Sequence, residues 1–337
     1  MSESGDYTQS HYPQHDFNAA RALYDQHAGR SFDDAKTSGK NLDDVRPKSI
    51  SSLSRHVVFM GIDVTGSNKG NPEPFFVKSP YLAHEAKTEY FGDDVEFCFG
   101  AIGDANGRTF GDNYGDKYPL QIRPFIGAED VDATKARVEE LINEGGGGGQ
   151  THENYELYLL YLLHNAKIPN ALKPLIIIYG DESPYEQINL QQAKDIACVE
   201  LHEGITTEAL FEELCRRFSI YFIQAPYNND GGFENPSSTT KRVYDDWVRL
   251  IGADHVAQML DRNRLVDVVF GIFGQETGKV DYFYEEIKGR QSKAQVAAAS
   301  KALATIHSAH MLAKTTTGCS QSHMPVQGRP MRKLLDD

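Results

Sequence analysis

The fold is decided by residues 56–67, which read HVVFMGIDVTGS. The first seven residues are largely apolar, and such a run predicts a central strand that is buried on both faces of a sheet. The apolar run ends at Asp63, after which Thr65, Gly66 and Ser67 follow. The stretch therefore predicts a core strand that ends in a loop of oxygen-bearing side chains.

Segments with the pattern of strands alternate with segments of helical spacing on the C-terminal side of this stretch. The other predicted strands are Val95–Ile102, Tyr118–Phe125, Pro174–Tyr179, Ser219–Gln224 and His255–Leu260, and Pro119 and Pro124 mark the second of these as an edge strand. Helical spacing covers Asp130–Asn143, Glu153–Ala166, Thr207–Phe218, Thr240–Ile251 and Asn263–Phe273. The alternation predicts an α/β fold: a doubly wound, mostly parallel, six-stranded sheet flanked by helices.

Composition divides the chain into four parts. Residues 1–54 are polar and predict a partly ordered N-terminal arm, and residues 55–278 hold the predicted sheet domain. Residues 279–314 contain an Ala, Lys and Gln-rich stretch and predict a C-terminal helical extension. Residues 315–337 are polar and predict a mobile tail.

The composition also limits the classes of partner. The 337 residues are 40% hydrophobic, which excludes a wholly disordered chain. Lys and Arg number 34 against 48 Asp and Glu, a net charge of −14 that disfavours nucleic acid and anionic membranes as partners. No apolar run approaches the roughly 20 residues that span a bilayer. The N-terminus does not have the pattern of a secretory signal, and four widely spaced cysteines fit a reducing compartment, so we expect a cytoplasmic protein.

Oxygen-bearing residues stand where three of these segments end or begin. Asp63, Thr65 and Ser67 follow the first strand, Thr151 follows a run of five glycines, and Asp181 follows the strand at 174–179. In an open α/β sheet, ligands bind at the carboxyl ends of the strands. Carboxylates and hydroxyls suit Mg²⁺ or Mn²⁺ better than zinc, which would favour Cys or His. The sequence thus predicts a divalent metal site.

Each piece of this pattern also has an ordinary structural explanation. Asp63 and Ser67 alone are typical of a turn and a helix N-cap, Thr151 alone of a cap, and Asp181 alone of a turn. Other motifs fail: Ser67 and Asn68 stand where a phosphate-binding loop needs Lys and Ser or Thr, and no G-x-S-x-G motif is present. Only the ordered combination favours the metal site.

That ordered combination resembles the metal-ion-dependent adhesion site of the von Willebrand factor A (VWA, integrin I-like) domain family, D-x-[ST]-x-S, then Thr, then Asp. The resemblance covers about residues 55–274 and implies a Rossmann-like VWA fold. It implies that Thr65 and Ser67 coordinate the metal directly, Thr151 directly or through water, and Asp63 and Asp181 mainly through waters. A departure from the pattern is Glu182, which follows Asp181 where Gly is frequent.

The same resemblance implies a function. The metal would bind an Asp or Glu carboxylate of a partner protein, which makes the chain an intracellular adaptor, associated with an AAA+ ATPase or a multi-protein stress or defence system. No general base or nucleophile stands out beside the site, so no enzymatic activity is expected. A metal-dependent phosphoester hydrolase using the same oxygen cluster is the alternative. An RNA-associated VWA protein of the Ro type is disfavoured by the charge of −14.

Overall fold

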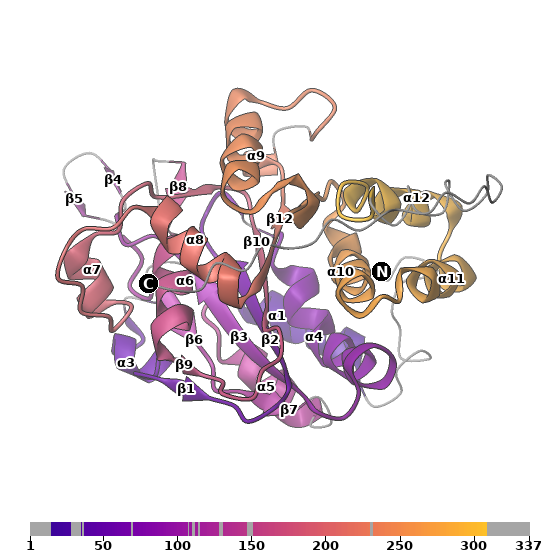
Figure 1. The fold of residues 1–337 in the computed structure, drawn as a ribbon, viewed down its shortest axis with the longest axis horizontal. Helices are drawn as coiled ribbons and strands as arrows, with labels where there is room; N and C mark the ends of the chain where they lie inside the picture. The colour runs from indigo at the N-terminus through magenta and orange to yellow at the C-terminus, as the bar shows by residue number, and fades with distance from the viewer. Residues whose placement is uncertain are drawn as a thin grey trace, which may run out of the picture.

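The computed structural model describes residues 15–27, 35, 37–68, 70–106, 108–109, 112–113, 115–127, 131–146, 151–229 and 232–308. It confirms a mixed α/β fold with a central, mostly parallel sheet that is flanked by helices (Figure 1). No helix within these ranges is both long and apolar enough to cross a membrane.

Within the described residues the central sheet has seven strands, and five of them are parallel. Their order is β13 (Val256–Gln258), β12 (Ser219–Gln224), β10 (Leu175–Gly180), β2 (His56–Asp63), β3 (Val95–Ile102) and β6 (Leu120–Ile122), and β7 (Ile126–Gly127) also pairs with β3. Strands β6 and β7 are antiparallel to β3. The single edge strand expected over residues 118–125 is therefore two short strands. Pro124 lies between them, where it has no N–H to donate to a ladder.

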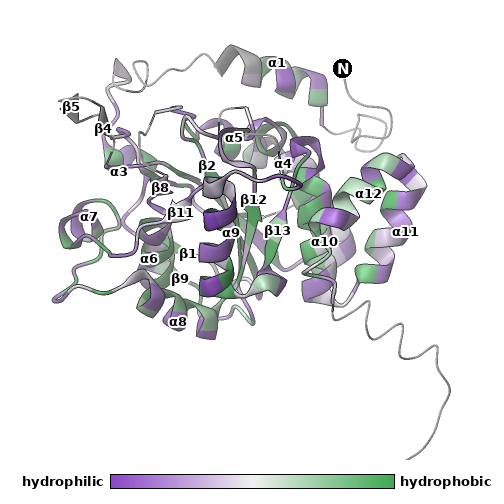
Figure 2. Cartoon of the chain, turned by 90° about the horizontal axis from the view of Figure 1, so that it is seen from above, coloured by the Kyte–Doolittle hydropathy of each residue, from purple (hydrophilic) through white to green (hydrophobic). Residues whose placement is uncertain are grey.

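Both faces of the sheet are buried, as the apolar runs predict. In β2, Val58, Met60 and Ile62 pack into one core, while Val57 and Phe59 pack into the other. Successive side chains of a strand point to opposite faces, so a strand covered on both sides must be apolar throughout. Figure 2 shows the hydrophobic strands β12 and β13 beside α9 (Ser238–Ile251), whose visible side is largely hydrophilic.

Two sets of helices cover these faces. The first core receives residues of α1 (Phe17–His27), α4 (Glu73–Glu85), α5 (Val131–Glu139), α10 (Leu265–Thr277), α11 (Val280–Arg290) and α12 (Lys293–Ala302). The second core receives residues of α6 (Tyr155–Asn165), α7 (Leu190–Asp195), α8 (Thr207–Arg217) and α9. Helix α3 (Leu42–Val45) contributes Val45 to a third, small cluster.

Residues 68–79, which hold Pro72 and Pro74, lead into the first helix of the sheet domain. In the structure α4 begins after Pro72, and Pro74 lies in its first turn, where a missing N–H leaves no helical hydrogen bond unmade. Pro80 lies inside the helix, and a π-helical turn over Ala86–Phe91 follows it. Tertiary packing thus holds a helix that local propensity disfavours.

The C-terminal extension consists of two helices that pack against the core. The two helices are separated at Ser292, whose side chain caps the start of α12 in a reciprocal arrangement with Gln295. Leu303 and Ile306 are buried in the same core as α10. Figures 1 and 2 both show α10, α11 and α12 grouped at one side of the sheet. Residues 309–314 and the tail expected at 315–337 lie outside the described residues.

Candidate functional site

Asp63 lies at the carboxyl end of β2 and is fully buried. Its Oδ1 accepts hydrogen bonds from the backbone N–H of Thr65 at 2.9 Å and from the Thr65 hydroxyl at 2.7 Å. Its Oδ2 accepts from the hydroxyl of Tyr155 at 2.7 Å, and its backbone oxygen accepts from Asn68 Nδ2 at 2.9 Å. Every one of these donors is uncharged, so the loop orders the carboxylate without neutralising it.

Ser67 connects the first loop to the loop that follows β10. Its hydroxyl donates to Asp181 Oδ1 at 3.0 Å and lies 3.4 Å from the Thr65 hydroxyl. Asp181 is also fully buried, and its Oδ2 accepts from the backbone N–H of Asn228 at 3.0 Å. The structure therefore brings four of the five predicted residues together: Asp63, Thr65, Ser67 and Asp181.

Glycines allow this close approach of loops. Gly66 N–H donates to the carbonyl of Gly146 at 2.8 Å, and a Cβ on Gly66 would lie 3.2 Å from the carbonyl oxygen of Gly145. A Cβ on Gly180 would lie 2.1 Å from the Tyr155 hydroxyl, which is too close for any side chain. The start of the glycine run thus lies against Gly66 in the first loop. Its last three glycines, 147–149, lie outside the described residues.

Thr151, the fifth predicted residue, is held by an arginine. Its hydroxyl and its backbone oxygen both accept from Nη2 of Arg242 on α9, the backbone oxygen at 3.3 Å. The two residues that follow it form β8 (His152–Glu153), which pairs in parallel with β11 (Ser183–Pro184). The pairing places the Thr151 segment alongside the Asp181 loop, but the hydroxyl of Thr151 is engaged by a cation.

Two glutamates that the sequence did not predict as ligands also lie at this edge of the sheet. Glu153 and Glu182 are each 2% exposed, and the Oε2 atom of each has no hydrogen-bond partner among the described residues. Glu153 and Ser67 act to lower the pKa of Glu182, against the larger effect of burial. The indole N–H of buried Trp247 donates to the backbone oxygen of Glu182 at 2.9 Å and fixes this turn.

Burial raises the pKa values of all four carboxyl groups. The pKa of Asp63 is raised by burial, against the hydrogen bonds from Tyr155 and Thr65. The pKa of Asp181 is raised well above its usual range by burial and then by the charge of Asp63. Burial, Asp63 and Asp181 raise the pKa of Glu182 to about 9, and burial with Asp63 and Glu182 raises that of Glu153. Each group resists ionisation because its negative charge has no compensation.

The fit of a divalent cation can be judged from these observations. Among the described residues, no Lys or Arg forms an ion pair with Asp63, Asp181, Glu153 or Glu182. Buried carboxyl oxygens without partners and neighbouring hydroxyls are the donor set that Mg²⁺ or Mn²⁺ prefers. Within the same ranges, no three His, Cys, Asp or Glu side chains are arranged as a ready-made metal-binding group. The residues fit a cation held by two aspartates together with hydroxyls.

Sequence reasoning missed several residues of the site: Asn68, Glu153, Tyr155, Glu182, Asn228 and Arg242. Glu182 was visible only as a departure from the family pattern. Tyr155 opens a helix whose apolar face hides its role, and Asn228 donates through its backbone. No signal in the sequence could have connected Arg242 with Thr151, because 91 positions separate them.

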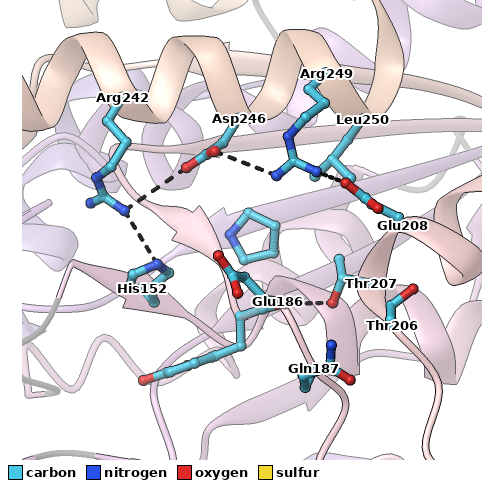
Figure 3. Close-up of a pocket in the computed structure, with 12 residues that line it drawn as sticks. His152, Glu186, Gln187, Thr206, Thr207, Glu208, Arg242, Asp246, Arg249 and Leu250 are labelled. Atoms are coloured by element: carbon cyan, nitrogen blue, oxygen red, sulfur yellow. Dashed lines mark hydrogen bonds and ion pairs between the residues drawn. The ribbon is translucent and has the colours of Figure 1, made fainter.

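A cavity of about 530 Å³ lies beside the site, between α9 and the turn after β11 (Figure 3). Arg242, Asp246 and Arg249 project into it from α9, and Asp246 lies between the two guanidinium groups, 3.8 Å from Arg242 and 3.4 Å from Arg249. His152 lies below Arg242, and Glu208 pairs with Arg249. The cavity thus adjoins the site through Arg242.

No protein-family model and no curated protein matches the chain. Among solved structures, the pilus adhesin SpaC from Lactobacillus rhamnosus GG in an open conformation is similar with a TM-score of 0.44 and 10% identity, over 71% of this chain and 31% of that one. Proximal thread matrix protein 1 from the mussel byssus is similar with a TM-score of 0.39 and 11% identity, over 67% of this chain and 48% of that one. The chain spans less than half the length of either protein.

Proposed function

We propose that the chain is a protein-interaction module that depends on a divalent cation, with the doubly wound sheet and the adhesion site of the VWA family. The observation that carries the proposal is the position of Ser67. Its hydroxyl lies between Thr65 and Asp181, at 3.4 and 3.0 Å, next to buried carboxyl groups that no cation of the described chain neutralises. A dication at this point would supply the missing charge.

The proposed ligand of the metal is a carboxylate of a partner protein. A Mg²⁺ or Mn²⁺ ion facing the two aspartates Asp63 and Asp181 is balanced in charge, and the hydroxyls of Thr65 and Ser67 add none. Hard cations of this kind prefer further oxygen ligands. An Asp or Glu side chain of a partner would complete the coordination, so the contact would form only when metal is present.

The setting of this adaptor rests on the family resemblance alone. We propose a cytoplasmic protein that works with an AAA+ ATPase or within a multi-protein stress or defence system. The net charge of −14 supports a protein partner over nucleic acid or an anionic membrane.

A metal-dependent phosphoester hydrolase is the second candidate, and Glu182 favours it. A buried carboxyl group with a pKa of about 9, directly after the proposed metal ligand Asp181 in the chain, keeps its proton at neutral pH and could protonate a leaving group. Turnover of p-nitrophenyl phosphate with Mg²⁺ or Mn²⁺, lost in the Glu182→Gln variant, would support this candidate.

The adaptor function can be tested by affinity capture from cell extract with the wild type and a Ser67→Ala variant, each in Mg²⁺ and in EDTA. We expect a protein that the wild type retains in Mg²⁺ and loses in EDTA, and that the variant does not retain in either buffer. Asp254→Asn removes an exposed carboxylate and should behave as the wild type. Once the protein is identified, changing its contacting Asp or Glu to Asn or Gln should abolish retention. Equal capture in Mg²⁺ and EDTA would contradict the proposal.

A further inference from the structure

Arg242 binds the hydroxyl oxygen of Thr151, the same atom that a metal ion would use. The guanidinium donates from one nitrogen to the Thr151 hydroxyl and to its backbone oxygen. An arginine stays protonated and can only donate, so it occupies a lone pair of the hydroxyl oxygen. A metal would use the same oxygen, and a cation bonded to that oxygen repels a dication.

His152 gives Arg242 a second contact with this segment. Its Nε2 lies 3.2 Å from Arg242 Nη1. Because the arginine must be the donor, Nε2 is the acceptor and the imidazole is neutral, with its proton on Nδ1. Burial first, and then the charge of Arg242, lower the pKa of His152, in agreement with that assignment. Arg242 thus binds two successive residues, Thr151 and His152.

Asp246 is an alternative partner for the guanidinium of Arg242. Its side chain is 37% exposed, and the carboxylate of Asp246, one helical turn along α9, lies 3.8 Å away. The cavity of about 530 Å³ opens on the same side (Figure 3). A guanidinium that turned towards Asp246 would keep an ionic partner and would release the hydroxyl of Thr151.

We propose that Arg242 is a positioning residue that holds Thr151 out of the coordination sphere of the metal, so that metal and guanidinium compete for one hydroxyl. The inference rests on the proposed metal site and adds a control on it. Full coordination then requires Arg242 to leave Thr151, and any group that draws Arg242 into the cavity would raise the affinity for metal.

Arg249 provides the matched control. It lies on the same helix, lines the same cavity and pairs with Asp246 and Glu208, but makes no contact with Thr151 among the described residues. Arg242→Gln and Arg249→Gln remove the same charge from the same cavity, and only the first frees Thr151.

The test is the dissociation constant of Mn²⁺, measured by electron paramagnetic resonance on the full chain. The variants are Arg242→Gln, Arg249→Gln, Thr151→Ala and the double variant Arg242→Gln/Thr151→Ala. We expect Arg242→Gln to bind Mn²⁺ about tenfold more tightly than the wild type, and Arg249→Gln to change the affinity by less than about twofold. The double variant should match Thr151→Ala, because Arg242 acts through that hydroxyl.

Several results would overturn the inference. An unchanged or weaker affinity in Arg242→Gln would do so, as would an equal gain in Arg242→Gln and Arg249→Gln, which would indicate a general charge effect. A gain that persists in the Thr151→Ala background would show that Arg242 acts by another route. If the wild type binds no Mn²⁺, the proposed metal site fails as well. If it binds Mn²⁺ through Asp63 but ignores Arg242, only this inference fails.

Discussion

Two buried aspartates of the same chain are treated in opposite ways. Asp267, on α10, is fully buried and bonded to Arg264 at 3.0 Å and to Gln291 at 2.6 Å, with Arg290 at 3.6 Å. Asp63 is equally buried, but the hydrogen-bond donors to its carboxylate, from Thr65 and Tyr155, are all uncharged. Arginines of the C-terminal part of the chain neutralise the carboxylate of Asp267. At the edge of the sheet, no described Lys or Arg forms an ion pair with Asp63.

The difference teaches that burial alone does not define the role of a charge. A buried carboxylate without a counter-ion destabilises a fold strongly, so its charge must be met by a proton or by a cation from outside. At Asp267 the chain supplies the cation itself, which is typical of a structural ion pair. At Asp63 and Asp181 the described residues supply no positive counter-charge, which is typical of a binding site.

The largest effect is expected where the charge is compensated. Asp267→Ala removes the buried carboxylate that Arg264 and Arg290 share, and breaking a buried pair of this kind lowers the free energy of unfolding by about 3 to 5 kcal/mol. Urea denaturation would measure the loss. Asp254→Ala, which removes an exposed carboxylate, should stay within about 0.5 kcal/mol of the wild type. A small loss in Asp267→Ala would show that the pair is not structural.

The second prediction concerns the uncompensated site. Mg²⁺ at about 100 times its dissociation constant should raise the stability of the wild type by about 2.7 kcal/mol, because it binds only the folded state. Asp181→Asn removes a proposed ligand and should lose most of this gain. Denaturation with Mg²⁺ and with EDTA measures both. A gain of equal size in Asp181→Asn would place the ion elsewhere.

The third prediction uses pH. Burial raises the pKa of Glu156, at the same edge of the sheet, from 4.5 to about 8. Between these values the folded state keeps a proton that the unfolded state has lost, so stability falls as pH rises, by up to about 1.4 kcal/mol per pH unit. Glu156→Gln cannot titrate and should show a shallower fall between pH 5 and 8. Identical slopes in EDTA would contradict the assignment.

The smallest effect is expected at two tyrosines of α6. Tyr155→Phe removes the hydroxyl that donates to Asp63 and should lower the free energy of unfolding by about 1 kcal/mol. The hydroxyl of Tyr158 is equally buried but has no hydrogen-bond partner in the described part of the chain, so Tyr158→Phe should be neutral or slightly stabilising. Equal losses in the two variants would mean that the bond to Asp63 contributes nothing.

Much of the sheet could be predicted from the sequence, because a strand buried on both faces is a local pattern. The bounds of β3 and β12 match their predicted ranges, and β2 and β10 end where Asp63 and Asp181 were expected to begin the site. Strand ends that share one edge also explain why four of the predicted site residues lie together. Prediction failed at the edge strand, which is split into β6 and β7 on either side of Pro124.

The site itself could be predicted only in part, for the same physical reason. Thr151 lies in the expected segment, but its hydroxyl accepts a hydrogen bond from Arg242, 91 residues away in the chain. Glu182 and Glu153 come together through the pairing of β11 with β8, two strands of two residues each that no periodicity could reveal. Their burial, and hence their raised pKa values, follow from that tertiary contact.

The central claim is that the uncompensated edge of the sheet binds one divalent cation, and counting bound Mn²⁺ tests it most directly. Electron paramagnetic resonance of the wild type, Asp63→Asn and Asp254→Asn at neutral pH would give the number of ions per chain. We predict one ion in the wild type and in Asp254→Asn, and none in Asp63→Asn at the same concentrations. One ion in all three proteins, or none in the wild type, would contradict the account.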